Sequence, residues 1–369
     1  MQIPFFRYAR VFAPWERELT EAFLRVARAG AFILQEDVRL FEEELAAYCG
    51  VAAAVGVGNA TDAIELVLRA LGIGRGDEVI LPSHTFVASA AAVVHVGATP
   101  VLAEIGADHL LDPADAARRI TPRTRAIMPT QLNGRTADMD ALGELAARHG
   151  LLLLEDSAQG LGSRFRGRMA GTFAPAGVYS FYPAKTLGAL GDAGAIVTDD
   201  VDLADRLRRL RDHGRDGHGA DPALWGRNSR LDNLQAAFLR VKLRHVDREI
   251  ETRRRLAARY HAGLEGLACV TRPPFDDDPA RFDAFQNYEL EADDRDGLRE
   301  HLARRGVGTA LQWGGKGLHQ FDALGTRCSL PVTDRILARS LLLPMNTSLT
   351  DEEVDYVVRA VREYYEGRA

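Results

Sequence analysis

The scarcity of lysine marks three positions of this chain as candidates for amine chemistry. Of the 46 basic residues, only Lys185, Lys242 and Lys316 are lysine, and the others are arginine. A composition so rich in arginine, which a GC-rich genome favours, retains lysine mainly where arginine cannot replace it. A nucleophilic amine is such a case, because an amine can lose its proton and a guanidinium cannot.

Lys185 belongs to the strongest local motif of the sequence. The segment Ser180–Gly188 has the sequence Ser-Phe-Tyr-Pro-Ala-Lys-Thr-Leu-Gly, and the glycine-rich segment Gly191–Gly194 follows it. This pattern predicts a strand end, a proline turn that presents the lysine, and glycines that let the backbone pass close to a ligand. Burial or nearby positive charge would lower the pKa of Lys185 and make it a nucleophile. A lysine in an ordinary surface turn is the alternative.

Asp156 is a candidate partner for a cationic ring nitrogen. The apolar run Leu151–Leu154 predicts a buried strand that delivers Asp156 at its carboxyl end, where open α/β sheets bind ligands. Gln159, three residues on, could reach the same pocket. An Asp156 that merely caps the following turn is an equally simple interpretation.

A third segment, Val55–Asp62, predicts an anion site. A strand passes through Gly56 and Gly58 into a helix start, where free backbone N–H groups and the helix dipole favour a phosphate. The segment lacks the third glycine of a dinucleotide fingerprint, and no Walker lysine follows it. An ordinary capped helix is the alternative. Taken together, an amine, a carboxylate and a phosphate site specify pyridoxal 5′-phosphate, whose protonated ring accepts carbanion electrons.

The elements that position these groups follow an alternating pattern between about Val38 and Asp200. Apolar strands alternate with helices, which predicts a mostly parallel sheet covered on both faces. Beyond Asp200 the pattern predicts four further features: a charged helix at Val201–Asp212, a long loop at Gly214–Trp225, one long helix at Leu231–Ala262, and a smaller α+β lobe from about Ala268. A final helix at Asp351–Tyr365 is opened by Thr350. We therefore predict a large domain at residues 1–245 and a small one at residues 246–369.

Composition restricts the classes of function. The net charge of −6 and the absence of a polybasic run disfavour nucleic-acid and membrane partners. No apolar run long enough for a bilayer span or a signal sequence is expected. Cys49, Cys269 and Cys328 are too far apart for a metal pair or a disulfide framework, so no metal site is predicted and a reducing cytoplasm is the expected location.

The chain resembles the DegT-type nucleotide-sugar aminotransferases, which are pyridoxal-phosphate enzymes of aminotransferase fold type I. The resemblance extends from about residue 3 to residue 365. It rests on a series of motifs in a fixed order: Gly58–Ala63, Pro82–Ala88, Ile120–Thr124, Ile127–Pro129, Ala137–Asp140, Glu155–Gln159, Ser180–Gly188 and Asn228–Asp232.

The resemblance implies a role for each matching cofactor residue. Lys185 would carry the cofactor and then move the proton between substrate and cofactor, Asp156 would pair with the ring nitrogen, and Gln159 would lie near the ring hydroxyl. Phe86 would stack on the ring, although a core aromatic is the alternative. The residues implied for the phosphate are Ala60, Thr61, Ser180 and, from the partner subunit of a homodimer with shared active sites, Asn228.

The second lobe departs from the family pattern. The segment Gln312–Gln320 stands where many members have a Tyr-Pro-x-Pro-Leu-His loop, and Asn133 stands where an aromatic residue is common. The loop is expected to face the substrate. Trp313 could stack on the sugar or base, unless it is a core anchor; Lys316, unless it is simply solvated, and His319 could contact the diphosphate. Arg230 is a candidate for pairing with a carboxylate or diphosphate.

The resemblance implies transfer of an amino group, with L-glutamate as donor, to a keto-deoxy sugar nucleotide. A dTDP-linked acceptor aminated at C3 or C4 is expected, for an amino sugar of a natural product or surface glycan. Two alternatives remain open at this point. One is a regulatory relative that binds the cofactor without turnover, and the other is a sugar dehydratase. In sugar-dehydrating relatives a histidine replaces the lysine, which Lys185 disfavours.

Overall fold

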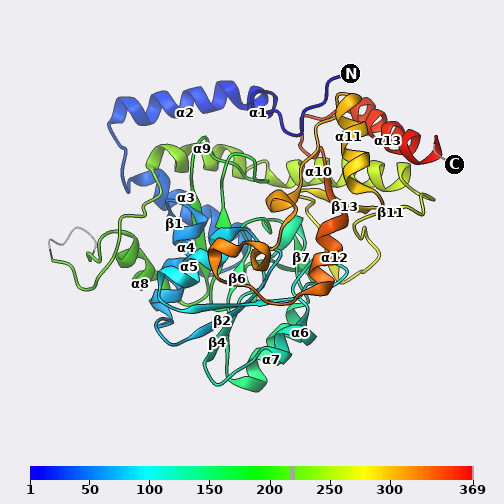
Figure 1. Ribbon diagram of the computed structural model, residues 1–369. Helices are drawn as coiled ribbons and strands as arrows, with labels where there is room; N and C mark the ends of the chain where they lie inside the picture. The colour runs from blue at the N-terminus through cyan, green and yellow to red at the C-terminus, as the bar shows by residue number, and fades with distance from the viewer. Residues whose placement is uncertain (217–220, 368–369) are drawn as a thin grey trace.

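The large sheet forms the centre of the molecule in the computed structural model, which describes residues 1–216 and 221–367 (Figure 1). In spatial order its strands are β1 (Ala53–Val57), β10 (Gly194–Thr198), β9 (Gly177–Ser180), β6 (Glu155–Asp156), β5 (Leu152–Leu153), β4 (Thr124–Ile127), β2 (Glu78–Pro82) and β3 (Thr99–Ala103). Strands β5 and β6 are consecutive along the chain and join the two halves. At this junction the N–H of Asp156 donates to the carbonyl of Pro129 at 3.0 Å.

The sheet is mostly parallel, as the sequence predicts. Neighbours from β3 to β5, and β6 with β9, run parallel, whereas β10 is antiparallel to both β1 and β9. Every residue of β1, β2 and β10 is buried, because helices cover both faces. The fold class is therefore confirmed.

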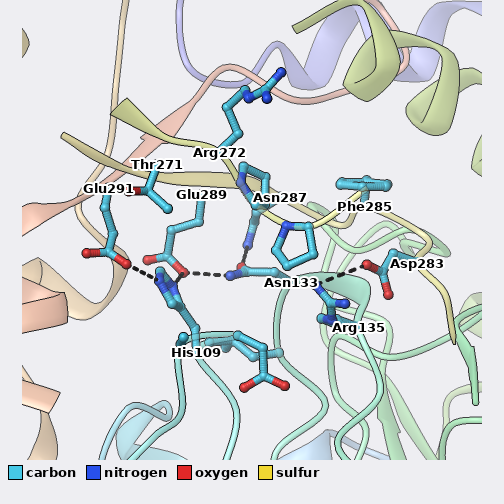
Figure 2. Close-up of a pocket in the computed structure, with 15 residues that line it drawn as sticks. His109, Asn133, Arg135, Thr271, Arg272, Asp283, Phe285, Asn287, Glu289 and Glu291 are labelled. Carbon is cyan, nitrogen blue, oxygen red and sulfur yellow. Dashed lines mark hydrogen bonds and ion pairs between the residues drawn. The ribbon is translucent and has the colours of Figure 1, made fainter. Parts of the chain in front are cut away.

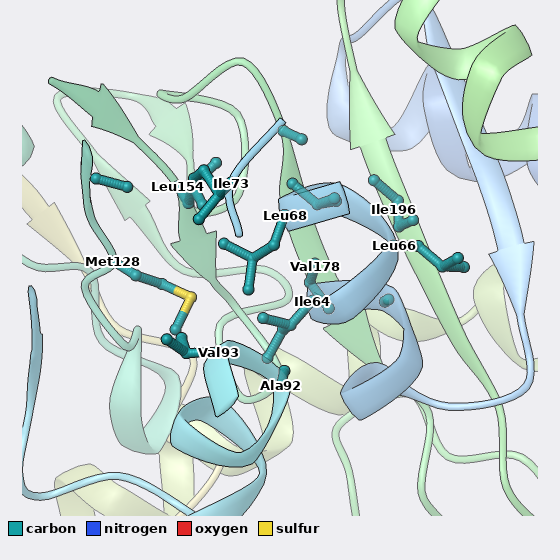
Figure 3. Packing of buried hydrophobic residues seen from close by; sticks show 14 of the residues in the cluster. Ile64, Leu66, Leu68, Ile73, Ala92, Val93, Met128, Leu154, Val178 and Ile196 are labelled. Carbon is teal, nitrogen blue, oxygen red and sulfur yellow. The ribbon is translucent and has the colours of Figure 1, made fainter. Parts of the chain in front are cut away.

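Side chains alternate in direction along each strand, so the buried residues form separate clusters on the two faces of the sheet. Val178 and Ile196 pack into one cluster with α4 (Ala60–Ala70), α5 (Val87–His95) and α8 (Val201–Arg211), as Figure 3 shows. Their neighbours Tyr179, Ala195 and Val197 face the opposite cluster, which includes α3 (Glu36–Cys49) and α9 (Asn233–Leu243). The helices α6 (Pro113–Arg118) and α7 (Met139–His149) complete the covering beside β4 and β5.

The long helix predicted at 231–262 is in fact two helices. Helix α9 ends at Leu243 and α10 (Val246–Gly263) begins three residues later. Between them His245 leaves helical geometry, with φ −121° and ψ 5°, and its N–H donates to the carbonyl of Lys242. Leu243, Val246 and Ile250 are all buried, so the apolar spacing continues across the break and the sequence pattern does not reveal it.

A second core lies in the C-terminal part of the chain. The antiparallel strands β11 (Val270–Thr271), β13 (Tyr288–Ala292) and β14 (Ser340–Leu343) pack with α10, α11 (Arg295–Arg304), α12 (Pro331–Arg339) and α13 (Asp351–Glu366). Ile3, close to the N-terminus, is fully buried in this core and bridges to Val307. We call residues 246–367 the small domain; the boundary after residue 245 stays a prediction.

Several smaller elements complete the description. The N-terminal helices α1 (Tyr8–Phe12) and α2 (Glu16–Ala29) lie over α9, and a separate small sheet contains β7 (Arg164–Phe165), β8 (Arg168–Met169) and β12 (Arg281–Phe282). Thr350 opens α13 with a reciprocal capping box with Glu353, as predicted. Residues 217–220 of the predicted loop at Gly214–Trp225 lie outside the described residues. No helix within residues 1–216 and 221–367 has the length and apolar composition of a bilayer span.

Candidate active site

The segments that follow β1, β2, β4, β6 and β9 meet around one cavity of about 500 Å³. All five strands point the same way, so their carboxyl ends share one edge of the sheet. The residues that line this cavity include Ala60, Thr61, Thr85, Phe86, Ser89, Thr130, Asp156, Gln159, Ser180, Tyr182, Lys185, Asp192 and Trp313.

Lys185 lies half-buried in this cavity, on the turn after β9. Its backbone N–H donates to the carbonyl of Tyr182 at 2.8 Å, which closes the proline turn. Burial lowers the pKa of the Lys185 amine to about 8, against the opposing charge of Asp156. The amine therefore loses its proton far more readily than an ordinary lysine does.

The residues on either side of Lys185 are fixed by one side chain of the small domain. Gln286 Oε1 accepts hydrogen bonds from the N–H and the hydroxyl of Thr186, at 2.6 and 2.8 Å. Gln286 Nε2 donates to the carbonyl of Ala184 at 2.9 Å. The backbone that carries the lysine is thus held on both sides.

Asp156 is buried at the end of β6, with a carboxylate that points to the same cavity. Oδ2 accepts a hydrogen bond from Ser89 at 2.5 Å, and Oδ1 accepts one from the N–H of Ala158 at 3.2 Å. Burial raises the pKa of Asp156 despite these bonds and the Lys185 charge. A cationic group in the cavity would stabilise the ionised carboxylate.

A row of hydroxyl groups supports this carboxylate, and no sequence pattern predicts it. Thr130 donates to Thr85 at 2.9 Å, and Thr85 bonds Ser89 at 2.8 Å, so three hydroxyls lead to Asp156. They come from the segments after β4 and β2 and from α5, which are separate in sequence. Asp192 and Tyr182 were also missed as lining residues, although both lie within or beside the lysine motif.

The first turn of α4 forms the opposite end of the cavity. Asn59 caps the helix by accepting a hydrogen bond from Asp62 N–H at 2.8 Å. The N–H groups of Ala60 and Thr61 have no intrahelical acceptor, because they lie in the first turn of the helix. Ser180 ends β9 opposite Gly194 of β10. A Cβ at Gly194 would lie 2.7 Å from the carbonyl carbon of Asn59, so only glycine lets β10 pass this close. The arrangement suits an anion.

Two aromatic rings cover the cavity. Phe86 precedes α5 as its N-cap residue, and 52% of its surface is exposed. Its ring lies 5.0 Å from that of Trp313, between centroids. Trp313 has a left-handed backbone, with φ 51°, and its half-buried side chain also packs against the core. Its buried indole N–H has no hydrogen-bond partner among the described residues.

Four predicted site residues do not line this cavity in the single chain. Asn228 is exposed, and Arg230 pairs with Asp212 at 3.1 Å beside a separate arginine-rich cavity. Lys316 is exposed, with its amine 5.8 Å from the ring of Phe321.

His319 is the fourth of these residues, and it is engaged elsewhere. It is only 4% exposed, and its two ring nitrogens contact Ser83 Oγ at 2.6 Å and Asp334 Oδ1 at 2.8 Å. With both nitrogens occupied, the ring holds the segment after β2 against the small domain.

A buried polar cluster that the sequence analysis missed lies behind the cavity. His109 contacts Glu289 Oε2 at 3.0 Å and Glu291 Oε1 at 3.4 Å (Figure 2). His84 Nε2 lies 3.5 Å from the same oxygen of Glu289. Asn133 donates to the same Glu289 oxygen at 2.7 Å. Burial alone would lower the pKa of His109, but the bonds to Glu289 and Glu291 raise it to about 10. The spacing of His84, His109 and Glu289 would admit a metal ion, but Glu289 Oε2 already accepts several hydrogen bonds. We therefore assign the cluster as a hydrogen-bonded ion pair.

The residues present fit pyridoxal 5′-phosphate. The helix start suits its phosphate, the buried carboxylate of Asp156 lacks the cation that the ring nitrogen provides, and the Lys185 amine has a lowered pKa. With the parallel sheet and its helices, this site defines a pyridoxal-phosphate-dependent transferase.

Sequence comparison identifies the family. The profile of the DegT/DnrJ/EryC1/StrS aminotransferase family matches residues 15–362, and the chain belongs to this family. It is 43% identical to dTDP-3-amino-3,4,6-trideoxy-alpha-D-glucose transaminase of Streptomyces venezuelae, over 99% of this chain and 97% of that protein. It is 42% identical to the erythromycin biosynthesis sensory transduction protein EryC1 of Saccharopolyspora erythraea, over 98% and 99% of the two chains.

Solved structures agree with this assignment. The crystal structure of S. venezuelae DesV in complex with a ketimine intermediate superimposes with a TM-score of 0.94, at 42% identity and 98% coverage of both chains. NtdA of Bacillus subtilis, with bound cofactor PMP, gives a TM-score of 0.92 at 27% identity, with 99% of this chain and 85% of that chain covered. The predicted family, fold type and pyridoxal-phosphate cofactor are confirmed.

Proposed function

We propose that this enzyme transfers an amino group from L-glutamate to a keto-deoxy sugar nucleotide, with dTDP as the nucleotide and C3 or C4 as the aminated carbon. The proposal rests first on Lys185, an amine of lowered pKa at the carboxyl edge of the sheet beside Asp156. The activity named for the 43% identical S. venezuelae transaminase supports the substrate class and favours C3. The product would be an amino sugar of a natural product or surface glycan.

Each residue of the cavity has a distinct task in this reaction. Pyridoxal 5′-phosphate, when bound, supplies an aldehyde that condenses with amines and a cationic ring that accepts electrons from the neighbouring carbon. Asp156, buried and hydrogen-bonded by Ser89, keeps the ring nitrogen protonated. Lys185 Nζ takes a proton from the substrate carbon and delivers it to the cofactor carbon, and it moves the proton in the opposite direction in the second half-reaction.

The remaining cavity residues bind and orient. The N–H groups of Ala60 and Thr61, with Ser180, hold the phosphate, and Gln159 contacts the ring oxygen. Phe86 covers the ring face and excludes water. In the two half-reactions the donor leaves its amine on the enzyme before the keto sugar binds, which gives ping-pong kinetics.

The second-lobe residues bind the sugar nucleotide in this proposal. Trp313 is the best placed, because it lines the cavity beside Phe86 and its indole N–H has no hydrogen-bond partner within the described part of the chain. Lys316 is exposed in the middle of the same loop. Contacts of Arg230 and His319 with substrate stay predictions, as both are paired within the chain.

A homodimer with shared active sites is part of the proposal. Asn228 is exposed and would reach the phosphate of the partner subunit. Large apolar side chains that a dimer interface would cover support this: Tyr8, Phe23, Leu24, Phe32, Tyr182 and Leu190 are all at least 38% exposed. The three cysteines are unbonded, which suits a reducing cytoplasm.

The experiment begins with an absorbance scan of the purified protein. A bound cofactor should give a visible or near-ultraviolet band, and L-glutamate should bleach it. Adding dTDP-linked 3-keto or 4-keto sugars to the bleached enzyme should restore the band with one of them, and the aminated product should be detected by mass. A band that glutamate never changes would instead indicate a regulatory protein. The 42% identical EryC1 suggests this role, because it is named a sensory transduction protein. Loss of water from the sugar without amination would indicate a dehydratase.

A further inference from the structure

Asn133 connects the small domain to the cofactor cavity. Its backbone N–H donates to Gln159 Oε1 at 2.9 Å. Its side-chain nitrogen Nδ2 donates to Glu289 Oε2 at 2.7 Å, and its oxygen Oδ1 accepts from Asn287 Nδ2 at 2.8 Å and Gln312 Nε2 at 3.1 Å. We propose that Asn133 is a positioning residue, through which Glu289 and Asn287 set the orientation of the Gln159 amide.

The hydrogen bonds of the Asn133 side chain leave one orientation of its amide. A carboxylate oxygen only accepts hydrogen bonds, so the atom facing Glu289 must be the amide nitrogen. The oxygen then faces two amide groups, Asn287 and Gln312, which both donate to it. Every polar atom of the side chain has a suitable partner, and three residues from two segments of the small domain determine its position.

The backbone at this point is equally constrained. Asn133 lies in the left-handed region, with φ 57°, which asparagine tolerates better than most residues. Gly134 follows with φ 79°, and its carbonyl accepts a hydrogen bond from Ala284 N–H at 2.7 Å. A Cβ at Gly134 would lie 2.6 Å from the backbone nitrogen of Gln286. The large-domain turn is therefore docked directly on the small-domain chain.

The charge on Glu289 makes it a strong acceptor for Asn133. Glu289 is buried on β13, and burial would raise its pKa, but the charge of His84 and the hydrogen bond from His109 hold the pKa well below its usual value. On its far side His109 contacts Glu291, which pairs with Arg339 at 3.2 Å. Hydrogen bonds to an ionised acceptor are about twice as strong as neutral ones.

The bond from Asn133 determines which end of the Gln159 amide faces the cavity. Asn133 occupies the oxygen, so the NH₂ group is presented to the cavity that Gln159 lines. The inference rests on the proposed function, in which this NH₂ donates to the cofactor ring oxygen. A donor there stabilises the deprotonated form of the bound chromophore and lowers the pH at which it titrates.

The test compares visible-absorption pH titrations of purified holoenzyme variants. Asn133→Gly keeps the left-handed backbone and its N–H but removes the side chain. Glu289→Ala removes the acceptor, and Glu289→Gln retains an acceptor oxygen of the same reach. Asn133→Gly and Glu289→Ala should each raise the midpoint by about half a pH unit or more, which corresponds to the free energy of one hydrogen bond. The midpoint of Glu289→Gln should stay close to that of the wild type. The dissociation constant of the cofactor should rise in parallel.

Additivity separates positioning from a general loss of structure. Asn133→Gly combined with Glu289→Ala should shift the midpoint no further than Asn133→Gly alone, because Glu289 acts through Asn133. Thr350→Ala, which weakens the distant helix α13 by removing its cap, should lower thermal stability without moving the midpoint. If Glu289→Ala does not fold, Asn287→Ala removes one donor to Asn133 and should shift the midpoint in the same direction.

Two outcomes would overturn the inference. Unchanged midpoints in the variants, or fully additive shifts, would show that Asn133 does not transmit the small-domain contacts to Gln159. Wild-type turnover of a keto sugar nucleotide would still uphold the proposed function in that case. A wild-type protein that shows no cofactor band would refute the proposed function itself.

Discussion

Lys185 illustrates at the scale of one residue what local sequence can and cannot convey. Its proposed role as the reactive amine follows from its residue type and its turn, and the proposed role of Asp156 follows from its place at a strand end; both residues line one cavity. The hydroxyl row from Thr130 to Ser89 could not be predicted, because its members are ordinary residue types brought together only by the fold. Chemistry that depends on one residue type is visible in sequence, whereas the groups that support it are not.

Replacing the reactive amine tests the central assignment. Lys185→Arg keeps a positive charge but removes a group that can lose its proton, so transamination should fall by about three orders of magnitude or more. The measurement is amination of a dTDP-keto sugar, with circular dichroism to establish that the variant folds. Lys316→Arg, at an exposed position outside the cofactor cavity, is the matched control for the first half-reaction, and L-glutamate should still bleach its cofactor band. Near-normal turnover in Lys185→Arg would contradict the assignment.

The pKa of Lys185 predicts a pH profile for cofactor attachment. The neutral amine reacts, and burial lowers the pKa to about 8, so the attachment rate to apoprotein should rise with pH and level off above about 8. An unshifted lysine would keep gaining reactivity toward 10.5. Borohydride reduction at each pH, followed by peptide mapping, measures the rate and the site of labelling. A rate that still rises steeply above pH 9 would indicate an ordinary lysine.

At the scale of elements, strand ends were predictable and contacts between distant segments were not. Helix α4, strand β9 and the cap of α13 lie within a few residues of their predicted positions, because each carries its own apolar period and capping residue. The break between α9 and α10 was missed because apolar spacing continues across it. The docking of Gln286 on the lysine turn joins residues about 100 positions apart, and no local pattern encodes it.

Gln286 provides a prediction at this scale. Gln286→Leu keeps the approximate volume but leaves the N–H and hydroxyl of Thr186 and the carbonyl of Ala184 without this partner. We expect a loss of about 1–3 kcal/mol in the free energy of unfolding and a fall in kcat of about 10- to 100-fold, because the lysine is displaced. Urea denaturation and steady-state kinetics measure the two effects. A Gln2→Leu control, at an exposed position away from the lysine turn and the cavity, should leave kcat unchanged; an equal fall in both variants would argue against a specific effect.

At the scale of the whole molecule, the two domains meet through buried polar groups as well as through apolar side chains such as Leu318 and Leu330, which pack in the large-domain core. His109 of the large domain lies between Glu289 and Glu291 of the small domain, as Figure 2 shows. These residues are about 180 positions apart, which is why sequence analysis could not pair them. The predicted dimer belongs to this scale too, since the residues that would complete the site, such as Asn228, lie at the surface of a single chain.

The domain junction predicts a pH-dependent stability. The pKa of His109 rises from 6.5 to about 10 on folding, so the folded protein binds the proton more tightly than the unfolded chain. This stabilisation is fully present below about pH 6.5 and is lost as pH rises toward 10. His109→Gln should therefore cost about 3 kcal/mol in the free energy of unfolding near pH 6.5, and much less at pH 9.5.

Urea unfolding at several pH values measures this difference. His149→Gln, at the exposed end of α7, is the matched control. Its difference from wild type in the free energy of unfolding should not change with pH. A His109→Gln difference that stays constant from pH 6.5 to 9.5 would show that His109 is not protonated at the junction.

The short run Ala284–Glu289 has a practical consequence for protein engineering. Its residues hold the lysine turn through Gln286, dock on Gly134, and reach Asn133 through Glu289. Chimaeras that exchange C-terminal halves between relatives to change sugar choice would replace this run together with the substrate loop. Crossover points placed after residue 289 would transplant the loop carrying Trp313 and leave the parental support of the amine intact.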